Sequence, residues 1–274
     1  MSNEPNGFAK YLVIFVDILG SQNRVDFQET YKINKIFHEE LERNKQNDMM
    51  HTVYFRKIYT FSDCAYIFYG FKDGISDERK DEGELFKVAL CNCEPIFLRF
   101  IKERILFRGG ISYGDAYVDP SKSMFFGDAV NKAYKMESEI AIHPRIVIDD
   151  YIAEAVLENI SSVKYKIVAK NPEYISILGG AGLVPKMPGT GEGIIEQDID
   201  EKYIYNYLHF PENNIILQDY YLSGESFIKE LIDFCFEQID RNMNYKIIDK
   251  YFYLQRFAQN KLENLLMSSD CDLQ

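Results

Sequence analysis

The chain has 274 residues, of which 46% are hydrophobic, and its formal net charge is −12. This length allows one large domain, or one domain with an appendage, and the hydrophobic content is ordinary for a globular protein. The acidic balance argues against a protein that binds a nucleic-acid backbone, which would carry a basic stripe. A small phosphorylated ligand stays open, because it needs only a few local cations.

The five cysteines favour a reducing compartment, because their number is odd and no two have the C-x-x-C spacing of a zinc site or redox pair. The first ten residues are polar and contain no apolar signal core. No run approaches the roughly 18 apolar residues that a membrane helix needs. We therefore expect a cytoplasmic protein that contacts neither a membrane nor nucleic acid.

The strongest strand pattern is the run Tyr-Leu-Val-Ile-Phe-Val-Asp-Ile-Leu-Gly at residues 11–20. A short apolar run that is rich in β-branched and aromatic residues and ends at Gly predicts a buried strand. A carboxylate inside such a strand is costly unless it is compensated. Asp17 therefore lies at the strand end and caps the next helix, pairs with a cation, or holds a metal ion.

The segments after this strand alternate between helical and strand patterns. In order, they predict a helix at 29–46, strands at 52–59 and 61–71, a helix at 85–102, a strand at 106–118, a helix at 127–140, a strand at 145–148, a helix at 149–158, and strands at 163–168 and 174–178. The core order β-α-β-β-α-β predicts a ferredoxin-like α+β fold, an antiparallel sheet backed by helices. In this fold the first strand lies beside the hairpin, so we expect Asp17 and Asp63 to lie close together.

The composition changes at Gly179. Glycines and prolines over residues 179–193 predict a loop. Two helical patterns follow, at 223–241 and 246–267. We expect a domain at residues 1–180 and, at residues 181–274, a loop and helical C-terminal extension that packs on the core or on a partner.

Asp17 and Asp63 are the first candidates for chemistry. Two carboxylates at one end of a sheet can hold two divalent cations, which clamp the attacking and leaving oxygens of a phosphoryl displacement. Oxygen ligands of this kind suit Mg²⁺ or Mn²⁺. Further along, Asn131 and Lys135 share one helical face, and Arg108 precedes a Gly-Gly pair. Taken singly, these residues are explained equally well by an exposed helix face and a surface ion pair.

Together and in this order, these segments resemble the class III nucleotide cyclases, the family of adenylate and guanylate cyclase catalytic domains. The resemblance covers roughly residues 10–178 and depends on motifs that are specific only in combination. The matching segments are Val16-Asp17-Ile18-Leu19-Gly20 for Phe-x-Asp-Ile-x-Gly, Asp63 just after the hairpin turn, Arg108-Gly109-Gly110-Ile111-x-x-Gly114 for Arg-x-Gly-Ile-x-x-Gly, and Phe126-Gly127-x-x-Val130-Asn131-x-Ala133 for Trp/Phe-Gly-x-x-Val-Asn-x-Ala.

The resemblance implies that Asp17, Asp63 and the backbone carbonyl of Ile18 bind two divalent cations, Mn²⁺ or Mg²⁺. The metals would activate the ribose 3′-hydroxyl of a nucleoside triphosphate, whose oxygen attacks the α-phosphorus while pyrophosphate leaves. Asn131 would orient the ribose. Lys135 stands where the family has an arginine that neutralises charge on the α-phosphate.

Lys135 departs from the family pattern, because a lysine supplies the charge but not the bidentate fork of an arginine. Either Lys135 suffices, or Arg108 or Lys132 assists it, or activity is weak. For the lysine that binds the triphosphate, the candidates are Lys166 and Lys170. Because the family builds its active site between two domains, the resemblance also implies a head-to-tail homodimer with two sites.

Tyr59 and Met124 stand where purine-specific members of the family carry polar side chains that select the base. Neither residue makes those contacts, and a tyrosine fills space and stacks on or hydrogen-bonds a smaller base. This departure resembles the pyrimidine cyclases of bacterial anti-phage (Pycsar) systems, which make cyclic CMP or cyclic UMP. It implies UTP or CTP as the substrate and a second messenger in anti-phage defence. Tyr59 is otherwise an ordinary strand aromatic.

Three other functions stay open. The first is a purine cyclase with atypical base contacts. The second is a diguanylate-cyclase-like enzyme, but the hairpin at residues 60–63 lacks the Gly-Gly-Asp/Glu-Glu-Phe signature of that family. The third is an inactive cyclase fold that serves as a binding module. Lys135 favours this third function, whereas the retention of both aspartates and Asn131 argues against it.

Overall fold

The computed structural model describes residues 7–20, 26–46, 52–119, 121–170, 193–209 and 224–271. By their contacts these residues form two compact units, one within 1–141 and 145–206 and the other within 142–144 and 207–274.

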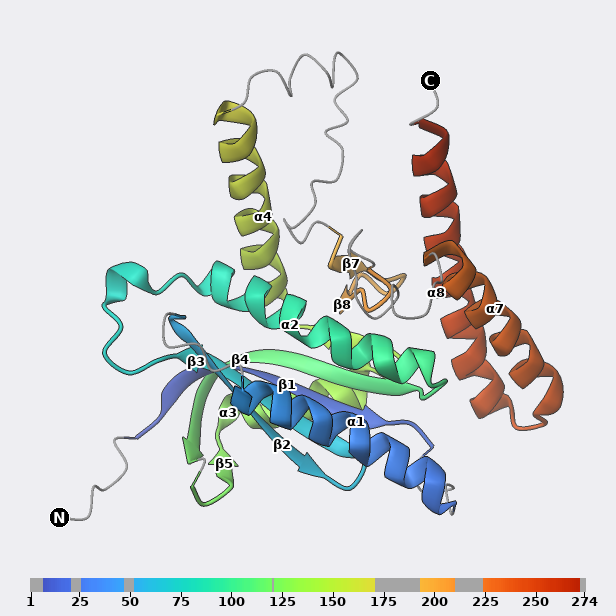
Figure 1. The fold of residues 1–274 in the computed structure, drawn as a ribbon, viewed down its shortest axis with the longest axis horizontal. Coiled ribbons are helices and arrows are strands. Elements are labelled where there is room, and N and C mark those ends of the chain that lie inside the picture. Colours follow the sequence, from blue (N-terminus) through green and yellow to red (C-terminus); the bar gives the residue numbers. More distant parts are fainter. Residues whose placement is uncertain are drawn as a thin grey trace. The chain divides into compact units, whose positions relative to one another are not determined.

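The elements of the first unit (Figure 1) are β1 (Ala9–Ile18), α1 (Phe27–Gln46), β2 (Tyr54–Phe61), β3 (Cys64–Phe71), a 3₁₀ turn η2 (Asp77–Arg79), α2 (Glu82–Lys102), β4 (Phe107–Asp119), β5 (Met124–Phe126), α3 (Asp128–Lys135), a π-helical turn η3 (Met136–Ile140), β6 (Ile146–Ile148), α4 (Asp150–Lys170), β7 (Ile195–Gln197) and β8 (Tyr203–Tyr205).

The sheet has the strand order β2-β3-β1-β4-β6-β8-β7, and β5 pairs with β4. The neighbours β2–β3, β3–β1 and β1–β4 are all antiparallel. This is the ferredoxin-like arrangement that the βαββαβ order predicts, so the expected α+β class is confirmed. The sheet then continues beyond that core, because β6 pairs with β4 in parallel and β8 and β7 add two antiparallel strands.

Both faces of the central strand β1 are covered. On one face, Phe107 of β4 packs against Phe97 and Phe100 of α2, with ring centroids 5.2 and 5.9 Å apart. On the other face, Val13 and Phe15 cluster with apolar residues of β3, β4 and α3. Side chains alternate along a strand, so Asp17 lies on the same face of β1 as Val13 and Phe15, which is the α3 face.

One sequence expectation is wrong: residues 163–168 belong to the helix α4 and not to a strand. Short apolar runs fit more than one period. In the sequence Val163 and Ile167 fall at i+3 and i+7 from Ile160, so the run fits a helical period as well as a strand. Lys166 and Lys170 therefore lie on a helix. The strand expected at 174–178 falls outside the described residues, and the domain division at residue 180 stays a prediction.

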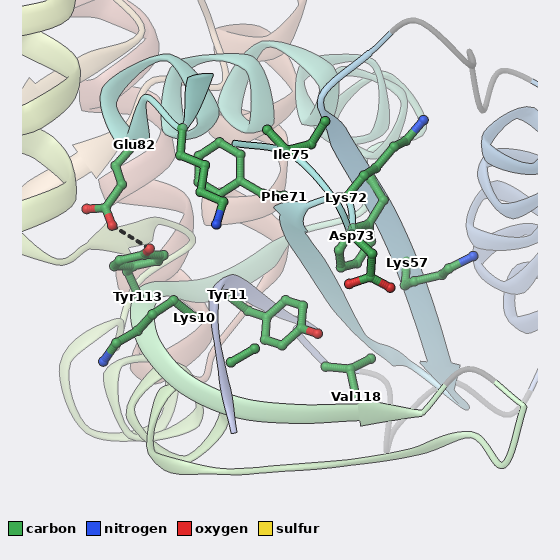
Figure 2. Close-up of a pocket in the computed structure, with 14 residues that line it drawn as sticks. Lys10, Tyr11, Lys57, Phe71, Lys72, Asp73, Ile75, Glu82, Tyr113 and Val118 are labelled. Carbon is green, nitrogen blue, oxygen red and sulfur yellow. Dashed lines mark hydrogen bonds between the residues drawn. The ribbon is translucent and has the colours of Figure 1, made fainter. Parts of the chain in front are cut away.

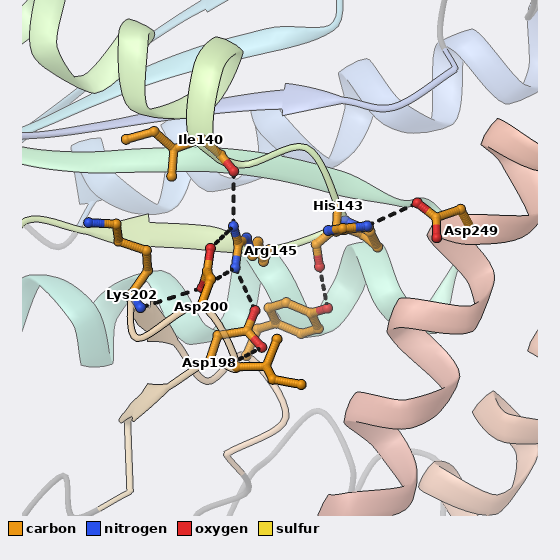
Figure 3. A network of polar contacts seen from close by, with 10 residues as sticks. Ile140, His143, Arg145, Asp198, Asp200, Lys202 and Asp249 are labelled. Carbon is orange, nitrogen blue, oxygen red and sulfur yellow. Dashed lines mark hydrogen bonds and ion pairs between the residues drawn. The ribbon is translucent and has the colours of Figure 1, made fainter.

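The second unit contains two helices, α7 (Gly224–Arg241) and α8 (Tyr245–Cys271), which confirms both helical patterns of the extension. They pack together, and the rings of Phe234 and Tyr251 meet edge to face. The short segment 142–144 belongs to this unit, since the Nε2 of His143 lies 3.0 Å from a carboxylate oxygen of Asp249 (Figure 3). Over the described parts of the chain, the helices lack the length and apolar content that a membrane crossing requires.

Candidate active site

The structure brings Asp17 and Asp63 to one end of the sheet. Asp17 is the penultimate residue of β1 and faces Cys64 of β3 in the strand register. Asp63 lies in the two-residue turn between β2 and β3, which closes because Ser62 adopts a left-handed φ of 50°. The N–H of Ile18 donates a hydrogen bond of 3.0 Å to the carbonyl of Asp63. The expected proximity of the two aspartates in the fold is therefore observed.

Arg108 lies on the other side of Asp17, opposite it in the β1–β4 register. Its Nε is 3.7 Å from a carboxylate oxygen of Asp17 and also forms an ion pair with Glu137 of η3. We call these three residues the Arg108 cluster. It joins two strands and a helical turn at the end of the sheet that also holds Asp63.

Glu137 is a buried carboxyl group of this cluster. Its side chain is only 3% exposed. The pKa of Glu137 is raised from 4.5 to about 7, chiefly by burial and in smaller part by the charge of Asp17, while the guanidinium of Arg108 lowers it. A carboxyl that titrates near neutrality beside a charged partner is characteristic of functional sites, although structural ion pairs also produce it.

A glycine pair in β4 allows η3 to approach closely enough for this ion pair. A Cβ on Gly110 would lie 2.3 Å from the backbone oxygen of Ala133 and 2.7 Å from the Cβ of Met136. A Cβ on Gly109 would lie 2.4 Å from the backbone oxygen of Phe15. The Gly109-Gly110 motif is thus explained by packing, and this packing sets Glu137 against Arg108.

The local field at this end of the sheet is negative. Burial raises the pKa of the Cys64 thiol to about 11, and the nearby charges of Asp63, Asp17 and Glu137 raise it as well. Within the described residues no group of three or more His, Cys, Asp or Glu side chains has a metal-binding arrangement. Two carboxylates and the backbone carbonyl of Ile18 nevertheless fit Mg²⁺ or Mn²⁺, since Mg²⁺ commonly takes one or two protein carboxylates and fills its shell with water and substrate phosphates.

The remaining candidates lie on other elements. Asn131 and Lys135 are exposed on α3, as their shared helical face predicts. The N–H of Asn131 donates to the carbonyl of the N-cap residue Gly127, at 3.1 Å, which closes the first turn of α3. Lys132 forms an ion pair with Asp149, which gives it a structural partner of its own.

Tyr59 packs against Phe125, the residue that follows Met124 in β5. The ring of Tyr59 packs against Phe125 at 4.9 Å and against Phe68 at 5.6 Å, and Met124 precedes Phe125 in β5. Met124 is 39% exposed. The Tyr59 hydroxyl is buried and has no hydrogen-bond partner among the described residues, and burial raises its pKa. A buried hydroxyl without a hydrogen-bond partner is uncommon in folded proteins.

Glu137 is the residue that the sequence interpretation missed. The sequence does point to Glu137 through its helical spacing. Val130, Ala133 and Glu137 fall at i, i+3 and i+7, on one stripe of α3 and η3. The first two are apolar and buried, and Glu137 is 2% exposed. A charged residue in an apolar helical stripe requires a buried partner, and Arg108 is that partner.

Comparisons with known proteins give matches only among solved structures. A scan against family models and a search of curated proteins both find no match. The chain is similar to the catalytic core of a rhodopsin-guanylyl cyclase with converted specificity in complex with ATPαS, with 20% identity and a TM-score of 0.40 over 56% of this chain and 84% of that one.

Two further structures match at the same level. One is the monomeric guanylyl cyclase domain of the RhoGC fusion protein from the aquatic fungus Blastocladiella emersonii, with 20% identity and a TM-score of 0.41 over 57% of this chain and 90% of that one. The other is a bacterial light-regulated adenylyl cyclase, with 16% identity and a TM-score of 0.40 over 56% of this chain and 46% of that one. Similarity this weak does not assign an activity.

Proposed function

We propose that the chain is a nucleotide cyclase that converts a pyrimidine nucleoside triphosphate, UTP or CTP, to its 3′,5′-cyclic monophosphate and pyrophosphate. The observation that carries the proposal is the hydrogen bond from the Ile18 N–H to the Asp63 carbonyl. It fixes two carboxylate-bearing residues, Asp17 and Asp63, on adjacent strand ends, with a guanidinium beside them. This donor set suits a metal-dependent displacement at phosphorus.

Asp17, Asp63 and the carbonyl of Ile18 would hold two divalent cations, Mg²⁺ or Mn²⁺. These cations would lower the pKa of the ribose 3′-hydroxyl and neutralise charge on the triphosphate. The chain itself supplies the cation beside the metal ligands. Arg108 is 26% exposed and can bind a phosphate oxygen through its guanidinium. Glu137, which is buried against Arg108, holds that guanidinium in place.

The second half of the site comes from another copy of the chain in a head-to-tail homodimer. Asn131 and Lys135 are exposed on α3, where a partner's substrate can reach them. Asn131 orients the ribose, and Lys135 places its ammonium against the α-phosphate. Each dimer then carries two sites, each built from the Arg108 cluster and Asp63 of one copy and α3 of the other.

Pyrimidine selectivity is supported by the surroundings of Tyr59. Its ring is packed between Phe68 and Phe125, which narrows the space for a base, and its hydroxyl has no hydrogen-bond partner among the described residues. Met124 adds an exposed apolar side chain on β5. A cytoplasmic role for the product in anti-phage defence completes the proposal, and this part depends only on the resemblance to pyrimidine cyclases.

The test is to incubate the purified protein with Mn²⁺ and each of the four ribonucleoside triphosphates separately, and to identify products by mass spectrometry. We expect cyclic UMP or cyclic CMP from the wild type and none from Asp63→Ala. Asp233→Ala, which removes an exposed carboxylate on α7, serves as the matched control and retains the activity. Cyclic AMP or cyclic GMP as the main product would overturn the pyrimidine selectivity. No product and no Mn²⁺-dependent nucleotide binding would overturn the cyclase proposal.

A further inference from the structure

A cavity of about 830 Å³ opens at the end of the sheet where β1 and β2 begin and β3 ends (Figure 2). Its lining residues include Lys10, Tyr11, Phe55, Lys57, Lys80 and Glu82. No residue to which we give a role in the reaction is among them. Along β1, Lys10 and Asp17 are separated by roughly 23 Å at about 3.3 Å per residue. The cavity is therefore distinct from the end of the sheet that holds the Arg108 cluster.

The wall of the cavity on the α3 face of the sheet is aromatic. The rings of Tyr11 and Phe55 meet edge to face, with centroids 5.7 Å apart. They are held over Gly70, where a Cβ would lie 2.9 Å from atoms of both rings. In Figure 2 the hydroxyl of Tyr11 points toward Asp73, across the open space. Gly70 thus leaves room for two rings that a planar ligand can pack against.

Lysines outnumber acids in the lining of the cavity, although the chain carries a net charge of −12. Four lysines and two acids line it. Of the acids, Glu82 is already engaged, because its two carboxylate oxygens accept hydrogen bonds from the hydroxyls of Tyr113 and Tyr151, at 2.6 and 2.5 Å. An anionic ligand therefore needs a lysine of this lining that no carboxylate already pairs.

The lysines differ in how far they are already paired. Lys10 forms an ion pair of 3.0 Å with Asp115, and Lys80 forms one of 2.7 Å with Asp77. Lys57 has no ion pair with any other described residue, so its ammonium is the cation most readily available to a ligand. It projects from β2 on the same face as Phe55, two residues away.

We propose that this cavity binds a small molecule that joins a planar ring to an anionic group, of the size of a nucleoside monophosphate. The ring packs on Tyr11 and Phe55, and the phosphate is bound by Lys57 at the rim. A volume of this size lies within the range of ligand pockets, about 300–1,000 Å³. This binding site does not depend on the proposed cyclase activity and is occupied without divalent metal.

The experiment measures binding of uridine 5′-monophosphate by titration calorimetry and ligand-observed NMR, with EDTA present. We expect saturable binding of millimolar affinity or better. Because a charge-assisted contact contributes about 1.5–3 kcal/mol, Lys57→Glu should weaken it about tenfold or more. Gly70→Ala should also weaken it, by displacing both rings. Uridine and inorganic phosphate should each bind more weakly than the nucleotide.

Two control variants complete the design. Lys246→Glu makes the same charge change at an exposed position of α8 and should leave the affinity unchanged. Asp17→Asn should also leave it unchanged, because the catalytic end of the sheet is not involved. The proposal is overturned if the wild type shows no saturable binding, if Lys57→Glu binds as the wild type does, or if Asp17→Asn abolishes binding.

Discussion

Two arginines in the first unit, Arg108 and Arg145, each face two carboxylates. They differ in the nitrogens through which they contact these acids. The Arg145 side chain is 6% exposed and uses both terminal nitrogens (Figure 3). Its Nη1 donates to Asp198 and Asp200, at 2.6 and 2.9 Å, and its Nη2 donates to Asp200 and to the carbonyl of Ile140, at 2.7 and 3.0 Å. Arg108 makes both of its ion pairs through Nε alone.

The pKa values of the acids in the two clusters shift in opposite directions. The hydrogen bond from Arg145 lowers the pKa of Asp200 below its ordinary value. Burial raises the pKa of Glu137 to about 7 even though Arg108 is beside it. The Arg145 pairs therefore stabilise the fold and tie the segment before β8 to β6, whereas the Arg108 cluster keeps a buried carboxyl whose pKa is raised although a guanidinium lies beside it. A carboxyl perturbed in this way is expected at functional sites more often than in structural cores.

Arg145→Ala should give the largest loss of stability. Truncation leaves Asp198, whose side chain is 10% exposed, without its buried partner. Breaking a buried pair costs about 3–5 kcal/mol, and we expect about 3 kcal/mol because Asp200 is partly exposed. Urea unfolding measures the change, with the exposed Arg241→Ala as the matched control. A loss below about 1 kcal/mol, the level of a surface ion pair, would remove the distinction between the two clusters.

Glu137→Gln should lower turnover about 10–100-fold, the usual cost of losing a partner that orients a ligand or a catalytic group. The neutral amide no longer fixes the guanidinium of Arg108 by charge. The variant should keep its affinity for Mn²⁺, because Glu137 is not a proposed ligand, and Glu137→Asp should restore part of the activity. Steady-state kinetics with the accepted triphosphate would measure this. Unchanged turnover would mean that the ion pair is only structural.

A comparison of the wild type with Glu137→Gln also gives a prediction about the pH dependence of stability. A carboxyl whose pKa is raised in the folded state binds its proton more tightly there, so its protonated form stabilises the fold. This contribution is complete below pH 4.5 and is lost as the pH rises through about 7. The unfolding free energy of the wild type, relative to Glu137→Gln, should therefore decrease over this range in metal-free buffer. A constant difference would show that burial does not perturb Glu137.

Tyr59→Phe should have the smallest effect. Its hydroxyl makes no hydrogen bond to another described residue, so the unfolding free energy should change by less than about 1 kcal/mol. If the hydroxyl contacts the pyrimidine, KM should rise about three- to tenfold with kcat unchanged, the range of one hydrogen bond. Unfolding and steady-state assays on one preparation separate the two outcomes. A stability loss of several kcal/mol with an unchanged KM would make Tyr59 a core residue.

Much of the fold could be predicted from local patterns. The apolar run at 11–20, the hairpin and the helical stripes define the βαββαβ order, and that order places Asp63 beside β1. The failure at 163–168 arose because a short apolar run satisfies two periods at once. The strands β5, β7 and β8 were missed because each has three residues, too few to establish an alternation, whereas the equally short β6 is recognised because it consists of Ile and Val alone.

The candidate site shows a similar limit. Asp17 and Asp63 were accessible to sequence reasoning, because topology alone brings their strand ends together. The ion pair of Arg108 with Glu137 was not, because it depends on how closely η3 approaches the Gly109-Gly110 segment. A close approach between a helix and a strand is a property of tertiary packing, and the sequence only hints at it through a charged residue in an apolar stripe.

The most direct test of the difference between the two clusters compares Asp17→Asn with Asp200→Asn. Each variant removes one charge from a pair with arginine. Mn²⁺ binding is measured by the EPR signal of the free ion, and stability by urea unfolding of the same samples. We predict that Asp17→Asn loses Mn²⁺ binding with little loss of stability, and that Asp200→Asn loses stability and keeps Mn²⁺ binding. Equal Mn²⁺ affinity in the two variants, with the larger destabilisation in Asp17→Asn, would contradict the account.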